Sequence, residues 1–114
     1  MRVVDLTLGT DLAVKVEVAG TFGRRLLGLM GRAALAPGTG LLLTPCSNVH
    51  TWFMRFPIDL AYLDAGWHVL HTVEALAPFR LGPWVRGTRH VLELPAHRLR
   101  ETGTLPGNTL RLAD

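Results

Sequence analysis

Apolar and polar residues alternate near the start of the chain as they do in a strand with one buried face. In residues 12–18 the apolar side chains at every second position are Leu12, Val14, Val16 and Val18. Gly9 and Asp11 supply turn residues between this segment and the preceding apolar one. We therefore predict two strands, at residues 2–8 and 12–18.

The spacing of apolar residues lengthens after residue 20 to that of a helix. Phe22, Leu26, Leu29 and Met30 share one helical face, and Thr21 is a suitable N-cap. The prediction is one short helix near residues 22–31, followed by a break at residues 37–40, where proline and glycine gather.

The rest of the chain has the pattern of short strands separated by turns. Residues 41–44 form a buried strand candidate that ends at Pro45, and Pro57 divides the β-branched and aromatic segment 49–64 into two strands. A tight turn at residues 64–66 leads into a strand at 67–76, and residues 77–88 are a loop. Strands at 89–94 and 108–112 enclose a short helical turn at residues 95–101.

These elements predict a mainly β (β-rich α+β) fold. We expect an antiparallel β-sandwich or barrel of about seven to eight short strands with one short helix. The strand–helix order of a nucleotide-binding α/β fold is missing. The length of 114 residues suits a single domain over residues 1–114, and an apolar fraction of 48% favours a packed globule over disorder.

Charge is distributed unevenly, although the net charge is only +3. No acid stands between Glu17 and Asp59, or between Glu74 and Glu93. The arginines of these two acid-free stretches are Arg24, Arg25, Arg32 and Arg55 in the first and Arg80, Arg86 and Arg89 in the second. If the stretches meet in the fold, they form a positive face suited to an anion; the alternative is a solvated, arginine-rich surface.

Charged residues interrupt every apolar stretch near the N-terminus, so no secretory leader is recognisable. No apolar stretch approaches the roughly 20 residues that span a bilayer. We expect a soluble, cytoplasmic protein without membrane insertion.

Residues 45–59 hold the densest set of reactive side chains. Cys46, His50 and Met54 recur at every fourth residue, as in the ligand loop of a blue-copper site, but no second histidine precedes residue 50. A zinc site at Cys46 and His50 lacks a recognisable ligand spacing. We therefore expect no metal and no cofactor.

Two functional hypotheses for residues 45–59 remain. In the first, Cys46 is the nucleophile, His50 the base and Asp59 the orienting acid of a hydrolase or transferase. In the second, the segment belongs to a non-enzymatic module that binds a small ligand, an anion among the candidates, or a partner protein. The residues that we expect at the binding site are His50, Trp52, Arg55 and Asp59, with Arg25 and Glu93 contributing if the fold brings them close.

We favour the binding module, with the enzyme as the alternative and an assembly module as a third class. Nucleic acid is a weaker candidate partner. The loop that contains Phe79, Arg80 and Trp84 interleaves aromatic and basic residues, but a net charge of +3 is low for a dedicated nucleic-acid binder.

Several motifs resemble those of the domain-of-unknown-function 192 family. They are Arg25–Arg32 (RLLGLMGR), Gly40–Leu43 (GLLL), His50–Asp59 (HTWFMRFPID), Leu63–Gly66 (LDAG), Val91–Ala96 (VLELPA) and Gly107, in the family's order. The resemblance runs from about residue 20 to residue 112 and implies a small, mainly β fold without importing an activity.

Two positions depart from the family pattern. His97 stands where a glycine commonly follows the Leu-Pro-Ala motif, which suggests a different turn at that point. Asn is common in one branch of the family where Arg55 stands, which favours a binding or structural role for Arg55 over a catalytic one.

Overall fold

The computed structural model describes residues 1–21, 34–51 and 54–114. Within these ranges the chain forms eight strands and one short helix. The elements are β1 (Arg2–Asp5), β2 (Thr10–Ala13), β3 (Lys15–Ala19), β4 (Thr39–Leu43), β5 (Ile58–Leu63), β6 (Val69–Leu76), β7 (His90–Pro95), α2 (Arg98–Thr102) and β8 (Leu110–Ala113). The helix predicted at residues 22–31 lies outside the described residues.

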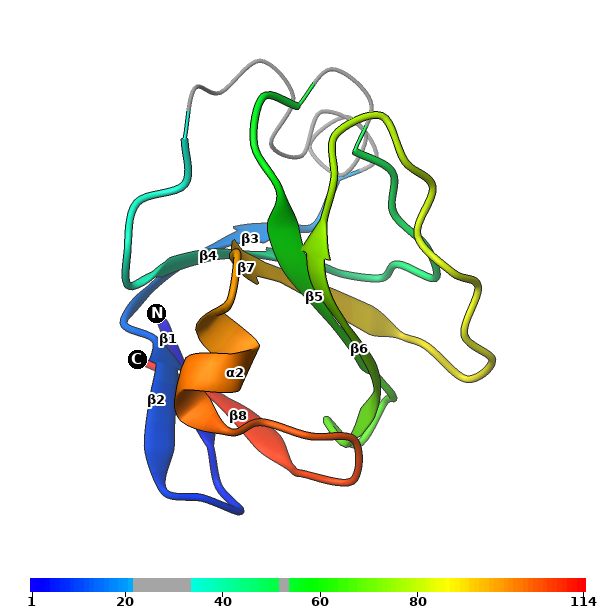
Figure 1. Cartoon of the computed structure of the whole chain (residues 1–114). Helices are drawn as coiled ribbons and strands as arrows, with labels where there is room; N and C mark the ends of the chain where they lie inside the picture. The colour runs from blue at the N-terminus through cyan, green and yellow to red at the C-terminus, as the bar shows by residue number, and fades with distance from the viewer. Residues whose placement is uncertain (22–33, 52–53) are drawn as a thin grey trace.

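The strands form two sheets, and Figure 1 shows the larger sheet above the smaller one, with α2 beside the smaller sheet. The larger sheet has the order β3-β4-β7-β5-β6 and the smaller has the order β2-β1-β8. Neighbouring strands are antiparallel except for β3 and β4, which are parallel. The predicted β-sandwich is confirmed, and within the described residues the sheets do not close into a barrel.

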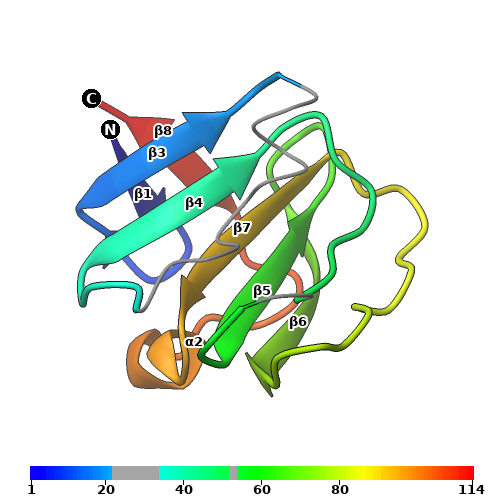
Figure 2. The ribbon, with the colours of Figure 1, turned by 90° about the horizontal axis from the view of Figure 1, so that it is seen from above.

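The larger sheet is covered on both faces, which explains why all six residues of β5 are buried. Its inner face packs on the smaller sheet and α2, through a core of Val3, Leu12, Leu42, Leu63, Leu92, Leu94, Leu99 and Leu110. Its outer face packs under the segments around residues 46–56 and 85, through a second core of Leu41, Leu43, Val49, Met54, Ile58, Leu60, Tyr62 and Val91. Figure 2 shows the molecule from above, with the loop after β4 and the loop after β6 at one end of the larger sheet.

The predicted single strand at 12–18 is wrong. The chain crosses from the smaller sheet to the larger one at Val14, which is 62% exposed although the alternating pattern placed it on the buried face. Leu12 on β2 and Val16 on β3 are buried, as the alternating pattern predicts. Val14, between the two strands, departs from the predicted burial.

The strands predicted around residues 41–44, 67–76, 89–94 and 108–112 correspond to β4, β6, β7 and β8. Pro57 immediately precedes β5, as predicted, but the first half of segment 49–64 forms no strand in its described part. There, an isolated bridge pairs His50 with Leu81. The predicted helical turn at 95–101 is α2, shifted by about one turn toward the C-terminus.

The two ends of the chain lie together, because Arg2 of β1 pairs with Ala113 of β8 (Figure 1). In the part of the chain that the structure describes, no helix has the length and apolar character to cross a membrane.

Candidate functional site

The two acid-free stretches meet in the fold. Three backbone hydrogen bonds join the loop after β4 to the loop after β6: Thr51 N–H to the carbonyl oxygen of Arg80, Phe79 N–H to that of Thr51, and Gly82 N–H to that of Val49, at 2.8, 2.8 and 2.9 Å. A fourth joins Cys46 N–H to the carbonyl oxygen of Arg89 at 2.8 Å. The predicted positive face requires the two acid-free stretches to lie together, and these hydrogen bonds show that parts of them do.

The side chain of Thr51 adds hydrogen bonds between the loop after β4 and the loop after β6. That side chain is fully buried, and its hydroxyl donates to the carbonyl oxygen of Ala77 at 2.6 Å while accepting the backbone N–H of Arg80 at 2.8 Å. These bonds and the backbone pairing fix one loop against the other without using any charged side chain. The described arginines of the two stretches, Arg55, Arg80, Arg86 and Arg89, are exposed.

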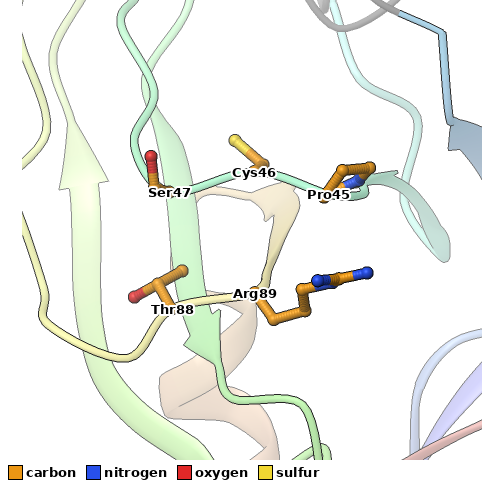
Figure 3. Close-up of a pocket in the computed structure, with 5 residues that line it drawn as sticks. All are labelled: Pro45, Cys46, Ser47, Thr88 and Arg89. Carbon is orange, nitrogen blue, oxygen red and sulfur yellow. The ribbon is translucent and has the colours of Figure 1, made fainter.

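An open pocket of about 300 Å³ lies between the two stretches, beside the hydrogen bond from Cys46 to Arg89. It is lined by Pro45, Cys46 and Ser47 from one stretch and by Thr88 and Arg89 from the other. Figure 3 shows the two segments side by side, with the Arg89 side chain running under Pro45 and the Cys46 sulfur pointing away from that side chain. The Thr88 hydroxyl donates to the carbonyl oxygen of Val85 at 2.7 Å, which fixes its direction.

Among the described residues, the arginines of this face differ from Arg2, Arg98 and Arg100, each of which has a carboxylate beside it. Arg55, Arg80, Arg86 and Arg89 are exposed, and none forms an ion pair within the described part of the chain. Elsewhere, Arg2 pairs with Asp11, Arg98 with Glu101 and Arg100 with Glu74. Within the described residues, four arginines without a carboxylate partner thus lie on the loops after β4 and after β6.

His90 lies directly after Arg89, at the start of β7. Its Nδ1 lies 2.6 Å from the Thr44 hydroxyl, and its ring stacks on Trp67 with 4.6 Å between the centroids. Burial lowers the pKa of His90, and the adjacent Arg89 lowers it further against an opposing effect of Asp64. His90 is therefore held in its neutral form beside the pocket.

Tyr62 lies beneath this region, on the outer face of β5. Among the described residues none forms a hydrogen bond with its fully buried hydroxyl. Burial is the largest cause that raises the pKa of Tyr62 to about 12, and the electrostatic effects of the nearby Cys46 and Glu93 act in the same direction. Gly82 covers the ring, since a Cβ at that position would lie 2.5 Å from the Tyr62 hydroxyl.

Asp59 has a structural position on the inner face of β5. It is fully buried, and its Oδ1 accepts the backbone N–H groups of Ala75 and His97 at 2.8 and 2.9 Å. Its Oδ2 accepts that of Leu99 at 2.9 Å. The carboxylate therefore ties β6 and the first turn of α2 to β5.

Asp59 and Glu93 lie on opposite faces of the same sheet. Glu93 pairs with Leu60, whose side chain belongs to the outer face, whereas Asp59 pairs with Leu94 of the inner face. Cys46 packs against the outer-face core. The structure therefore does not bring Asp59 to Cys46, and the arrangement of Cys46, His50 and Asp59 as a catalytic triad is not assembled.

The remaining candidates are only partly placed. His50 and Arg55 lie on the same loop as Cys46, half-buried and exposed respectively. Glu93 is buried beneath that loop, while Trp52 and Arg25 lie outside the described residues. Across the described ranges, no three His, Cys, Asp or Glu side chains are grouped closely enough to hold a metal ion.

Four of the five pocket residues, Pro45, Ser47, Thr88 and Arg89, were not among the predicted site residues. The absence of acids around them was the only available signal. It identified Arg89 as part of a positive stretch, but the pairing of Cys46 with Arg89 depends on the register of β4 against β7, which the sequence does not encode locally.

Comparisons with known proteins agree with this fold. A sequence model of the DUF192 family, described as "Uncharacterized ACR", matches residues 4–112. None of the proteins with curated descriptions matches the chain.

Two solved crystal structures share the architecture. A protein of unknown function from Novosphingobium aromaticivorans DSM 12444 has a TM-score of 0.87 and 22% identity, over 98% of this chain and 84% of that one. A protein from Sinorhizobium meliloti 1021, provisionally named a transcription regulator, has a TM-score of 0.83 and 24% identity, over 96% of this chain and 89% of that one. At these identities the two structures support the fold alone, whereas the family match spans nearly the whole domain. The chain belongs to the DUF192 family.

Proposed function

We propose that this domain is a non-enzymatic module that binds a small anion, such as a phosphate or carboxylate group, in the pocket between residues 45–47 and 88–89. One observation carries the proposal. Backbone hydrogen bonds join residues 46–51 of one acid-free stretch to residues 79–89 of the other, and a pocket lined by Arg89 lies beside them.

The chemistry of the pocket suits an anion. The Arg89 guanidinium offers parallel N–H donors, and charge-assisted hydrogen bonds of this kind are stronger than neutral ones. Ser47 adds an exposed hydroxyl. The nearby Glu93 is buried beneath the loops rather than in the pocket lining, so its carboxylate is not among the groups that an anion would meet there.

Calorimetric titration with inorganic phosphate tests the proposal. We expect the wild-type protein to bind phosphate and Arg89→Gln to bind it about tenfold more weakly or worse. The matched control is Arg111→Gln, which removes the same charge from an exposed arginine on β8. Equal affinity in the two variants, or no binding by the wild-type protein, would overturn the proposal.

Thermal unfolding with phosphate, sulfate, acetate and citrate extends the test to several anion classes. Phosphate and sulfate also stabilise proteins by exclusion from their surfaces, and that effect is equal in the two arginine variants. The difference between the variants therefore reports the pocket alone. A difference confined to carboxylates identifies a carboxylate ligand.

The thiol-enzyme alternative is tested at Cys46, the single cysteine of the chain. Cys46 is half-buried and its thiol donates to the carbonyl oxygen of Asn48 at 3.0 Å, so burial and this hydrogen bond both restrict its access to a reagent. We expect slow alkylation by iodoacetamide, slowed further by bound phosphate. Alkylation much faster than that of a free cysteine would favour the enzyme.

A further inference from the structure

A second feature of the positive face is apolar. Three large side chains of the loop after β6 are exposed: Leu81 and Trp84 at 68% each and Phe79 at 49%. They alternate with the exposed Arg80 and Arg86. We name residues 79–86 the docking loop; both views place the connection between β6 and β7 at the outer edge of the molecule (Figures 1 and 2).

The backbone of the docking loop is fixed. Phe79 and Arg80 donate their N–H groups to the carbonyl and hydroxyl oxygens of Thr51, and Gly82 donates to Val49. Gly82 is buried against Tyr62, so the loop has no room to sink further onto the sheet. The backbone on either side of Leu81 is therefore held in place, which reduces the entropy lost when the exposed Leu81 side chain binds.

The charge of the residues around these side chains indicates which kind of partner they would bind. No acid occurs between Glu74 and Glu93, and the first acid-free stretch lies alongside. Apolar side chains flanked by unneutralised arginines match an anionic bilayer, where tryptophan and leucine enter the interface and arginine contacts lipid phosphates. A single-stranded nucleic acid would use flat rings for stacking and gain little from an exposed aliphatic side chain such as Leu81.

We propose that the docking loop attaches this domain to the surface of an anionic bilayer. Leu81 and Trp84 enter the headgroup region, and Arg80 and Arg86 contact lipid phosphates. Such peripheral attachment requires no spanning helix. It involves a surface separate from the pocket lining and goes beyond the proposed binding of a small anion.

Co-sedimentation with vesicles tests the proposal. We expect the protein to bind vesicles of phosphatidylcholine mixed with phosphatidylglycerol, and to bind vesicles of phosphatidylcholine alone far more weakly. Leu81→Ser and Trp84→Ser should each weaken binding about tenfold. The matched control is Leu105→Ser, which changes a leucine that is 63% exposed in the loop before β8 and should bind as the wild type does.

The arginines and the fluorescence of Trp84 give independent readouts. Arg80→Gln and Arg86→Gln should each weaken binding about fivefold, while Arg111→Gln leaves it unchanged. Tryptophan emission should shift to the blue on anionic vesicles, and Trp84→Phe should lose that shift while still sedimenting with the vesicles. Unchanged urea midpoints confirm that the variants are folded.

Three results would overturn the proposal. They are equal binding to neutral and anionic vesicles, vesicle binding that is unaffected by Leu81→Ser and Trp84→Ser, and self-association in solution that both serine variants abolish. Tight binding to a thymidine oligonucleotide that depends on Trp84 and Phe79 but not on Leu81 would identify nucleic acid instead. Phosphate titration of Leu81→Ser distinguishes bilayer binding from anion binding in the pocket. Because this variant retains Arg89, it should bind phosphate as the wild type does.

Discussion

The backbone N–H of Cys46 donates a hydrogen bond to the carbonyl oxygen of Arg89 at 2.8 Å. This bond joins two residues that are far apart in sequence and belong to two stretches without acids. It brings Arg89 to the edge of the pocket that also contains Cys46. The functional proposal rests on this junction.

Asp59 is expected to stabilise the fold rather than the ligand. Asp59→Ala leaves three backbone N–H groups without their acceptor, two of them from the segment that begins α2, and should destabilise the protein by about 3 kcal/mol or more. Urea unfolding measures the loss, with the exposed Asp114→Ala as the control. An intact phosphate affinity in folded Asp59→Ala would place Asp59 outside the site, and a selective loss of affinity would place it inside.

His97→Gly is expected to stabilise the protein. His97 precedes α2 in the left-handed conformation, with φ of 72°, where a side chain is strained and glycine is not. The gain should be about 0.5–1 kcal/mol, since glycine also adds entropy to the unfolded chain. His97→Ala keeps the strain, so an equal gain from alanine would refute the explanation.

Gly82 and Tyr62 should be energetically coupled. Gly82→Ala places a methyl group against the Tyr62 hydroxyl and should cost about 1–3 kcal/mol. Tyr62→Phe removes a buried hydroxyl that lacks a partner among the described residues, and should be neutral or stabilising. The double variant should be less destabilised than the sum of the two single variants by about 1 kcal/mol. Strict additivity in urea unfolding would contradict the packing.

The pH dependence of stability should report His90. Its pKa in the folded protein is lowered from the ordinary 6.5, so the unfolded chain binds the proton first as the pH falls. The stability present above pH 6.5 is therefore lost as the pH falls through the folded-state pKa. His90→Phe keeps a ring against Trp67 and should show a smaller loss between neutral and mildly acidic pH. An identical loss in both proteins would show that His90 does not titrate in this way.

Much of the sheet was predictable because local signals marked its boundaries. Pro57 cannot donate a ladder hydrogen bond, and β5 begins directly after it. Asp64 lies at the predicted turn, where its carboxylate accepts the backbone N–H groups of Gly66 and His68 at 3.0 and 2.9 Å. Side chains that satisfy nearby backbone groups act within a few residues, so the sequence reveals them.

The crossing at Val14 was not predictable in the same way. The alternation of Leu12, Val14, Val16 and Val18 is unbroken, and nothing local shows that the chain leaves one sheet for another. Val14 becomes exposed because no strand covers the crossing, which is a property of the tertiary arrangement.

The positive charge around the candidate site was predictable from the sequence, but the residues that line the site were not. The missing acids are visible in the sequence, and the structure brings the two stretches together. Asp59 is a predicted site residue because it belongs to residues 45–59, and Glu93 is added on the condition that the fold brings it close. The pairing of Glu93 with Leu60 separates them onto opposite faces, and that register is set by contacts between strands distant in sequence.

An NMR titration of the ¹⁵N-labelled domain with inorganic phosphate tests the central claim most directly. The account predicts saturable shifts of the backbone amides of Cys46, Ser47, Thr88 and Arg89, with no comparable shift at Arg111. In Arg89→Gln these shifts should no longer saturate over the same phosphate range. Saturable shifts centred elsewhere, or none around the Cys46–Arg89 junction, would contradict the account.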